Sequence, residues 1–131
     1  MEGKGTDNSG VLRFGTASFE KSERLRLLSD FDYVRSSGVK YAGRFLVILI
    51  APARTGALKV GFICSRKFSK KAVVRNRAKR IMKEIFRNSK SGLMECELIM
   101  IPRLYLLKSG IREVQDEFIG LMREAGKWKL N

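Results

Sequence analysis

Cationic side chains gather in one short stretch of this sequence, between Arg66 and Lys90. Eleven lysine and arginine residues stand there beside a single acid, Glu84. Arginine presents a planar fork of donors that can hold phosphate with two bonds and stack on bases, while lysine acts as a compact charge. The stretch therefore predicts a polyanionic partner. The candidate contact residues are Arg66, Lys67, Lys70, Lys71, Arg75, Asn76, Arg77, Lys79, Arg80 and Lys83.

The tripeptide Arg75-Asn76-Arg77 makes structured RNA the favoured polyanion. Successive residues of an α-helix turn by about 100°, so the two arginines lie about 200° apart with Asn76 between them. One helix would then contact the phosphate backbone on both sides, while the Asn76 side-chain amide forms a hydrogen bond between them. The alternative is an ordinary solvated helix face, but such a face does not need charge of one sign. Arg80 and Glu84 are expected to form the one relieving ion pair.

A helix over about 71–90 would carry these charges. Its apolar residues recur with a period near 3.6 and so share one face, which predicts a core-facing side. Gly92 follows as the expected end marker. The inward residues are Val74, Ala78, Ile81, Met82, Ile85 and Phe86, and the opposite face holds Asn76, Lys79, Arg80, Lys83 and Arg87.

The rest of the chain supplies a small sheet and further helices. A short helix should be capped by Ser29 and end at Gly38. Apolar, β-branched runs predict strands at 44–50, 58–64 and 97–101. A closing helix at 111–123 would turn Val114, Phe118, Leu121 and Met122 inward. These patterns indicate an α+β fold, an α/β sandwich with helices against one small mixed sheet.

The two strands on either side of the basic helix form a strand–helix–strand unit with it. Such units have parallel strands, and their crossover is normally right-handed. The chain has 131 residues, which fits a single domain. We expect that domain over residues 20–131, after a disordered tail over 1–19 that is rich in glycine, serine and charge.

Composition excludes several functions. A net charge of +14 calls for an anionic partner. The sequence has no histidine and only two, widely spaced cysteines, so it offers neither a zinc site nor a histidine base. Cys64 and Cys96 should be reduced thiols in the core. The longest apolar run, 45–53, is too short to span a membrane, and residues 1–10 are not a secretory signal, so a cytoplasmic protein is expected.

Three other functions fit parts of the pattern. A ribosomal or assembly protein, or a DNA reader, would also carry a basic helix, although a helix-turn-helix needs a helix where a strand and loop are expected. A free-standing nuclease would need clustered carboxylates or a histidine base, whereas the aspartates are scattered. A membrane-surface helix would need an apolar face that can insert, with an aromatic rim.

The basic stretch resembles a known family signature. The residues Ser65-Arg66-Lys67, Ala72-Val73-Val74-Arg75-Asn76-Arg77-Ala78-Lys79-Arg80 and Phe86-Arg87 are similar to the signature of the bacterial ribonuclease P protein family. The similarity extends from about Arg24 to Ala125. It implies the order α-β-β-β-α-β-α, like the second domain of ribosomal protein S5, with an unusual left-handed crossover around the basic helix.

The resemblance also implies a function. The protein would bind the catalytic RNA of ribonuclease P and the 5′ leader of precursor tRNA, and so promote Mg²⁺-dependent endonucleolytic removal of the leader. The RNA would be the catalyst and would bind most of the Mg²⁺ with the substrate. The protein would supply no catalytic residue and no metal site, would not enter a membrane and would need no obligate protein partner. The ten cationic and amide residues named first would contact the RNA.

A second surface follows from the same resemblance. The leader would lie in a cleft between the first helix and the sheet, at Phe31, Tyr33, Arg35 and Leu49. This sequence departs from the family at Arg35 and Leu49, where members often have aromatic residues, so base stacking should be poorer unless Tyr33 and Tyr41 compensate. It also lacks the glycine that usually makes a tight turn before the basic helix, at Phe68–Lys71.

Overall fold

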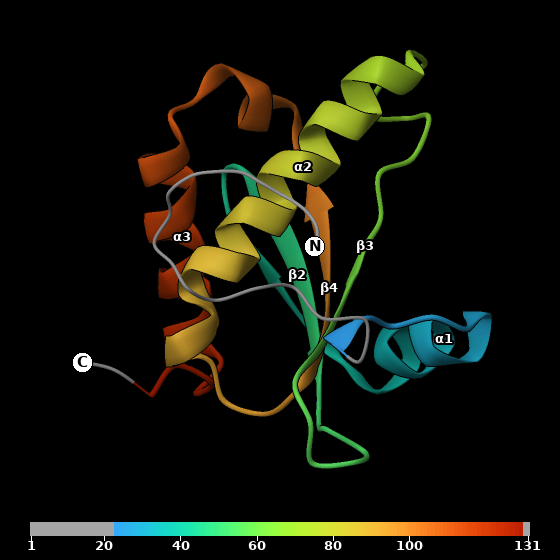
Figure 1. Ribbon diagram of the computed structural model, residues 1–131, viewed down its shortest axis with the longest axis vertical. Helices are drawn as coiled ribbons and strands as arrows, with labels where there is room; N and C mark the ends of the chain where they lie inside the picture. Colours follow the sequence, from blue (N-terminus) through green and yellow to red (C-terminus); the bar gives the residue numbers. More distant parts are fainter. Residues whose placement is uncertain (1–22, 130–131) are drawn as a thin grey trace, which may run out of the picture.

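The computed structural model describes residues 23–129, so the tail predicted at 1–19 lies outside the described part of the chain. Helices and strands follow in the order α-β-β-β-α-β-α, as the resemblance implied (Figure 1). They are α1 (Leu28–Ser37), β1 (Val39–Ala42), β2 (Leu46–Ala51), β3 (Lys59–Phe62), α2 (Ala72–Ser89), β4 (Glu97–Pro102) and α3 (Ile111–Glu124). Two short 3-10 helices, η2 (Lys90–Gly92) and η3 (Leu104–Lys108), precede and follow β4.

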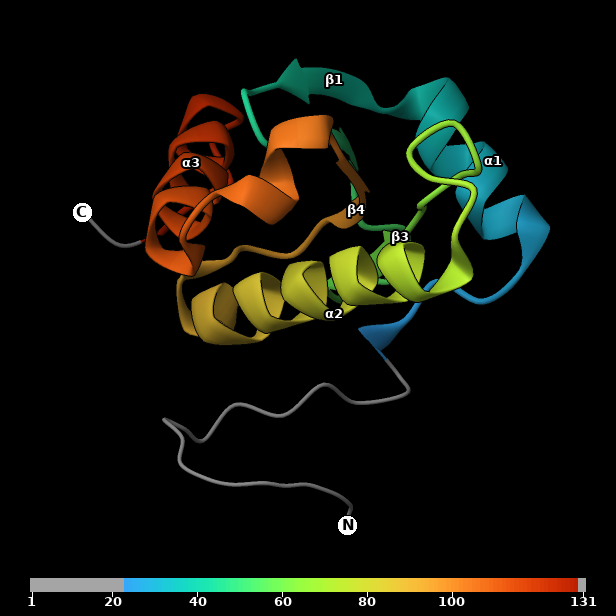
Figure 2. The same ribbon diagram turned by 90° about the horizontal axis from the view of Figure 1, so that it is seen from above.

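The strands form one four-stranded mixed sheet in the order β1-β2-β4-β3. β2 pairs antiparallel with both β1 and β4, while β3 runs parallel to β4. α2 and α3 pack on one face of the sheet, and α1 lies against the other (Figures 1 and 2). Within residues 23–129, the sheet therefore has one covered face and one face that a single short helix covers in part.

The crossover between the two parallel strands is left-handed. In Figure 1, β3 and β4 both run upward, α2 lies in front of the sheet, and β4 lies to the left of β3. A chain that leaves β3, passes in front and enters a strand on its left makes a left-handed turn. The general right-handed rule is thus wrong for this unit.

The main core lies between the sheet and the two longer helices. Phe86 and Phe118 are fully buried there, and Phe62 meets Phe86 edge-on with the ring centroids 6.5 Å apart. The four residues predicted to point inward from α3 are all buried, namely Val114, Phe118, Leu121 and Met122. On α2, the buried residues include Ala78, Met82, Ile85 and Phe86, as predicted, while Val74 and Ile81 are only half-buried.

The start of α1 differs from its prediction. The helix begins at Leu28, so Ser29 lies inside the first turn and does not cap it. Instead, one oxygen of Asp30 accepts hydrogen bonds from the N–H groups of Arg26 (3.2 Å) and Leu27 (3.0 Å). A carboxylate in the first turn can reach back in this way to the amides before the helix. Gly38 ends the helix as predicted.

The strand predicted at 44–50 begins two residues later because a carboxylate from α3 holds the backbone before it. Glu117 accepts hydrogen bonds from the N–H groups of Arg44, Phe45 and Leu46, at 2.6, 2.8 and 3.0 Å. Gly43 leaves room for this carboxylate, since a Cβ atom at position 43 would overlap it and displace the Glu117 side chain. β1 is thereby a separate edge strand, which apolar patterning did not reveal.

Gly92 has a packing role beyond the end of α2. A Cβ atom at this position would overlap the ring of Trp128, and Leu93 pairs with Trp128 in an isolated β-bridge. The chain after α3 therefore packs over the end of α2.

The prediction for the two cysteines is confirmed. Both cysteines are free, with Cys64 half-buried and Cys96 buried. Burial raises the pKa of the Cys96 thiol to about 12, so this thiol stays protonated. Within residues 23–129, no helix combines the length and apolarity that a membrane crossing requires.

Candidate RNA interface

Short-range hydrogen bonds, and not a glycine, shape the loop before α2. The N–H of Phe68 donates to the carbonyl of Ser65 at 3.0 Å. The hydroxyl of Ser65 accepts a hydrogen bond from the N–H of Lys67 at 3.3 Å, and the hydroxyl of Ser69 accepts one from the N–H of Lys71 at 3.2 Å. Serine hydroxyls that bond the backbone two residues on stabilise turns. The loop thus follows a defined path without the family's usual glycine.

Arg75 ties this loop to the helix. Its Nη1 donates to the carbonyls of Ser69 (2.9 Å) and Lys70 (3.0 Å). The side chain is half-buried, whereas Arg77 is exposed. The tripeptide predicted a phosphate fork at each arginine. In the structure the guanidinium of Arg77 is exposed, while that of Arg75 also supports the loop.

The loop and the outer side of α2 present the predicted RNA contacts together, and we call this surface the basic face. Its exposed members are Arg66, Lys67, Lys70, Lys71, Asn76, Arg77, Arg80 and Lys83. Arg75 and Lys79 are half-buried. All ten predicted residues therefore come from one loop and one helix, and most of them are open to a ligand.

Arg24 adds a cation to the basic face from outside the helix. It forms a β-bridge with Val60, which lays the segment before α1 beside β3. Burial first, and then the charges of Arg24 and Lys79, lower the pKa of Lys83. Neighbouring cations that lower the pKa of a lysine mark a positive potential that would stabilise an anion. Sequence spacing could not place Arg24 here, because its position depends on the pairing with Val60.

The single acid of the basic stretch does not pair with Arg80 as predicted. Glu84 forms an ion pair with Arg87, and its second oxygen accepts a hydrogen bond from Asn88 at 3.5 Å. Lys90 pairs with Glu23, with Nζ and Oε2 2.7 Å apart. Acids therefore offset charge at the end of α2 and leave its first three turns cationic.

The partly covered sheet face is a second candidate surface, which we call the open face. Side chains that alternate along the strands point to it: Ala51 and Ile99 are buried, and Leu49, Ile63 and Ile101 are half-buried. Phe31 of α1 packs directly on Gly61, where a Cβ atom would overlap its ring. Apolar and aromatic groups thus meet on this face beside helix α1.

A cluster of charged and aromatic side chains holds α1 against the sheet, and we call it the Arg54 clamp. Glu97 of β4 has a side chain that is 1% exposed. Its carboxylate accepts hydrogen bonds from Arg54 Nη2 at 2.6 Å and from the Arg54 backbone N–H at 2.9 Å. The same Nη2 donates to Asp30 of α1 at 3.0 Å. The guanidinium carbon lies 4.1 Å from the ring centroid of Tyr33, whose hydroxyl donates to the carbonyl of Pro52 at 2.7 Å.

The clamp shifts the pKa values of its members. The backbone N–H of Leu27, with smaller contributions from Arg26 and Arg54, lowers the pKa of Asp30. Burial tends to raise the pKa of Glu97, but the hydrogen bonds and charge of Arg54 outweigh it, so the net direction is down. The hydrogen bond to Glu97 is the largest cause that raises the pKa of Arg54. All three groups are therefore held in their charged forms.

The predicted leader residues come together only in part. Phe31, Tyr33 and Leu49 are half-buried and Arg35 is exposed. The ring of Tyr33 faces Arg54, and Arg35 lies 3.7 Å from Asp32 on the same helix. Tyr41 cannot supply the missing aromatic ring, because it packs against the main core on the covered side of the sheet.

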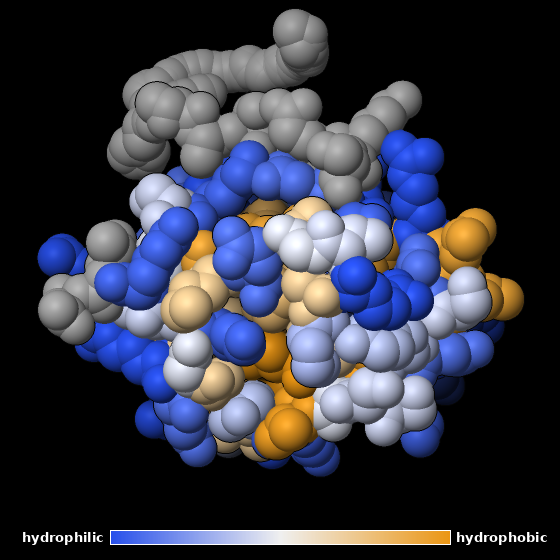
Figure 3. All heavy atoms as spheres, turned by 90° about the horizontal axis from the view of Figure 1, so that it is seen from below, coloured by the Kyte–Doolittle hydropathy of each residue, from blue (hydrophilic) through white to orange (hydrophobic). Residues whose placement is uncertain are grey.

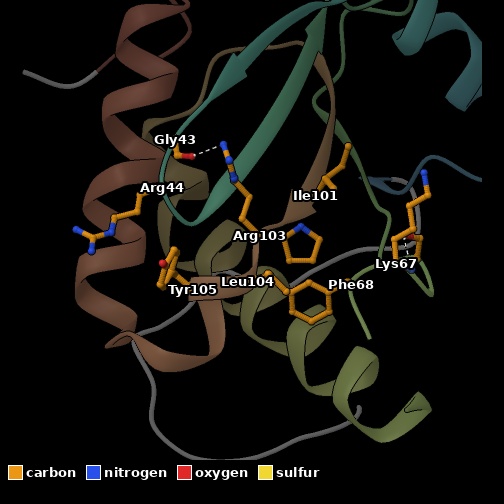
Figure 4. Close-up of a pocket in the computed structure, with 10 residues that line it drawn as sticks. Gly43, Arg44, Lys67, Phe68, Ile101, Arg103, Leu104 and Tyr105 are labelled. Carbon is orange, nitrogen blue, oxygen red and sulfur yellow. Dashed lines mark hydrogen bonds between the residues drawn. The ribbon is translucent and has the colours of Figure 1, made fainter. Parts of the chain in front are cut away.

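A pocket of about 530 Å³ extends the open face beyond the end of β4 (Figure 4). Its lining includes the cations Arg44, Lys67 and Arg103, the rings of Phe68 and Tyr105, and the apolar Ile101 and Leu104, with no carboxylate. Arg103 Nη1 donates to the carbonyl of Gly43 at 3.0 Å, and the Arg44 guanidinium lies 5.5 Å from the Tyr105 ring centroid. Sequence patterns did not bring Arg44 together with Arg103 and Tyr105, because the two segments are far apart in the chain.

The described surface carries charged, aromatic and apolar side chains. Seen from the end of the sheet where β2 turns into β3, it is mostly hydrophilic, with apolar side chains showing between the polar ones (Figure 3). Among residues 23–129, no three histidine, cysteine or acidic side chains gather as metal ligands. Asp30 and Glu97, which do approach each other, are already bonded to Arg54.

Fold and surfaces together define a class of protein: a small basic α+β domain with a cationic crossover helix and, on the other side of its sheet, a partly apolar face. Lysine and arginine side chains of this kind hold phosphate, and aromatic or apolar platforms receive bases. These features are suited to contact with a nucleic acid.

Comparison with known proteins gives the family. The sequence model of the family Ribonuclease P matches residues 19–126. A protein described as ribonuclease P protein component from Thermotoga maritima is 35% identical over 113 residues, which cover 82% of this chain and 96% of the relative. One from Clostridium botulinum is 31% identical over 111 residues, with 81% and 96% covered. The chain belongs to the ribonuclease P protein family, whose members work with an RNA subunit in tRNA 5′ processing.

Solved structures agree with this assignment. The RNase P protein from Thermotoga maritima superposes with a TM-score of 0.69 at 28% identity, covering 78% of this chain and 96% of that one. The RNase P protein from Staphylococcus aureus gives 0.71 at 24% identity, covering 82% and 99%, and supports the fold.

Proposed function

We propose that this chain holds the catalytic RNA of ribonuclease P with its basic face and the 5′ leader of precursor tRNA with its open face. The observation that carries the proposal is the placement of two RNA-compatible surfaces on opposite sides of one sheet. α2 lies on the covered side, and Phe31 lies on the other. The loop that contains Lys67 belongs to the basic face and also lines the pocket at the end of the open face, so one RNA assembly could contact both.

On the basic face, phosphate contacts would supply most of the affinity. Exposed lysine and arginine residues neutralise phosphates and release counterions, which favours binding to a folded RNA without reading its bases. Arg77 and Arg80 are exposed on α2, so each can form bidentate contacts. Arg75 would contribute mainly by holding the loop cations in place.

On the open face, the leader would bind as a single strand. Bases can stack on Phe31 and pack on Leu49 and Ile101, while cations at the pocket neutralise the backbone. Because Arg35 replaces an aromatic residue, guanidinium stacking and charge would take the place of one base platform.

The chemical step would belong to the RNA. Mg²⁺ bound by the RNA and the substrate would activate water and neutralise the scissile phosphate. The protein's own residues would bind and orient the two RNAs, and the protein alone would not cleave.

Site-specific crosslinking to the two RNAs tests this division. In a Cys64→Ser background, a photo-crosslinker would be attached to Arg80→Cys on the basic face, Arg35→Cys on α1, or Asp116→Cys on α3 as a control. Cys96 is buried and its pKa is raised to about 12, so it does not compete for the reagent. We expect position 80 to label the catalytic RNA, position 35 to label the leader and position 116 to label neither. Leader labelled from position 80, or equal labelling from all three, would refute the proposal.

A further inference from the structure

We infer that Arg54 is a positioning residue for leader recognition: through Asp30 it sets where α1 lies over the open face, and so where Phe31 can receive a base. The inference rests on the proposed function of the open face. It concerns a residue in the connection between β2 and β3, outside both proposed RNA surfaces.

The clamp joins α1 to the most buried part of the sheet through one guanidinium group. Glu97 lies at the start of β4, one of the two inner strands, and its side chain is 1% exposed, so it provides a rigid anchor. Arg54 Nη2 lies 2.6 Å from a Glu97 oxygen and 3.0 Å from an Asp30 oxygen. A shift of α1 away from the sheet would break the second of these contacts first.

Apolar packing alone holds α1 weakly. Val34 is the one fully buried residue of this ten-residue helix, and Leu28 is 83% exposed. α2 and α3, by contrast, bury several large side chains each. The orientation of α1 therefore depends on its polar contacts to a greater degree than that of the other helices.

The contact between Phe31 and the sheet does not lock the helix either. Phe31 rests on Gly61, which has no side chain to interlock with the ring. Gly61 offers no side-chain atoms that would hold the ring sideways, so the position of Phe31 follows the position of α1. Asp30 directly precedes Phe31, so a contact that fixes Asp30 also fixes the start of the leader-binding face.

The test compares Asp30→Asn with Asp32→Asn in the reconstituted holoenzyme. Both variants remove one negative charge from α1, and electrostatics alone predicts slightly tighter RNA binding for both. The side-chain amide that Asp30→Asn introduces could still accept the Leu27 N–H and cap the helix, and the Arg54–Glu97 pair would remain. The readout is the dissociation constant for a precursor tRNA with its leader and for the same tRNA without it.

We expect Asp30→Asn to weaken binding of the leader-bearing tRNA at least about fivefold, the scale of one lost hydrogen bond, and to leave the leaderless tRNA unchanged. Asp32→Asn should weaken neither. Arg54→Lys, which keeps a charge for Glu97 but loses the fork, should repeat the leader-specific loss. Equal affinities for Asp30→Asn and Asp32→Asn, or an equal loss on both tRNAs, would overturn the clamp. If the wild-type holoenzyme itself does not distinguish the two tRNAs, the proposed function of the open face fails instead.

Discussion

Gly61 shows how one residue can shape the open face. Gly61→Ala would push the ring of Phe31 off the sheet, since the added Cβ atom overlaps it. We expect the variant to lose about 1–3 kcal/mol of unfolding free energy, as in overpacked sites, and to bind leader-bearing tRNA more weakly. Urea denaturation and leader affinity measure the two effects.

The control is Gly120→Ala on α3, where nothing lies within 4 Å of the added Cβ atom. Alanine is the better helix former, so this change should stabilise the protein by up to about 1 kcal/mol. If Gly61→Ala proved as stable as Gly120→Ala, the ring would not rest on the glycine as described.

Substitutions at Arg75 and Arg77 distinguish support of the loop from direct contact with the RNA. Arg77→Ala removes an exposed fork and should weaken binding to the catalytic RNA by about 1–3 kcal/mol, the range for hydrogen bonds to charged groups, without changing thermal stability. Arg75→Ala should weaken RNA binding as well and also loosen the loop, because its bonds to Ser69 and Lys70 are lost. Proteolysis within the loop reports the second effect. Unchanged RNA affinity for Arg77→Ala would remove this residue from the interface.

At the scale of elements, apolar periodicity predicted those features that depend only on residues close together in the sequence. The inward faces of α2 and α3 follow from spacing, and so does the gathering of ten RNA-contact candidates on one helix and its loop. Spacing did not reveal β1, whose four residues include a lysine and no regular alternation. Nor could it show the left-handed crossover, because handedness is not encoded in the pattern of apolar residues.

The clamp and the pocket were missed for a related reason. Arg54, Glu97 and Asp30 are distant in sequence and meet only after β2, β4 and α1 have assembled. The pocket cations Arg44 and Arg103 come from separate connections. The prediction of an Arg80–Glu84 ion pair was wrong, because both arginines are within helical reach of Glu84 and Arg87 forms the ion pair.

The attachment of α1 should depend on pH. In the folded protein the pKa values of Asp30 and Glu97 are both lowered, whereas in the unfolded chain they are about 3.9 and 4.3. These carboxylates therefore add stability above the unfolded values, and this contribution is lost as the pH falls through the folded ones. We expect the unfolding free energy to fall as the pH drops below about 4.5.

Asp30→Asn should show a smaller fall between pH 7 and pH 3.5 than the wild-type protein, since one of the two groups no longer titrates. Urea unfolding at both pH values provides the measurement. Identical pH dependence for the two proteins would mean that Asp30 contributes nothing to acid sensitivity.

For the whole molecule, a net charge of +14, of which +10 lies between Arg66 and Lys90, predicts strong salt dependence. Six to ten phosphate contacts would give a slope of roughly −4 to −9 for log affinity against log salt. Filter binding to the catalytic RNA over a range of monovalent salt tests this expectation. A slope near zero would contradict binding through phosphates.

Reconstituted cleavage tests the central claim most directly. A bacterial ribonuclease P RNA and a labelled precursor tRNA would be incubated at low Mg²⁺, with this protein, without it, and with the Arg75→Ala/Arg77→Ala double variant. We predict that the wild-type protein restores cleavage at the mature 5′ end, that the protein alone cleaves nothing, and that the double variant fails at concentrations where the wild type succeeds. Binding of the RNA without any gain in cleavage would contradict the account and leave a general RNA-binding role in its place.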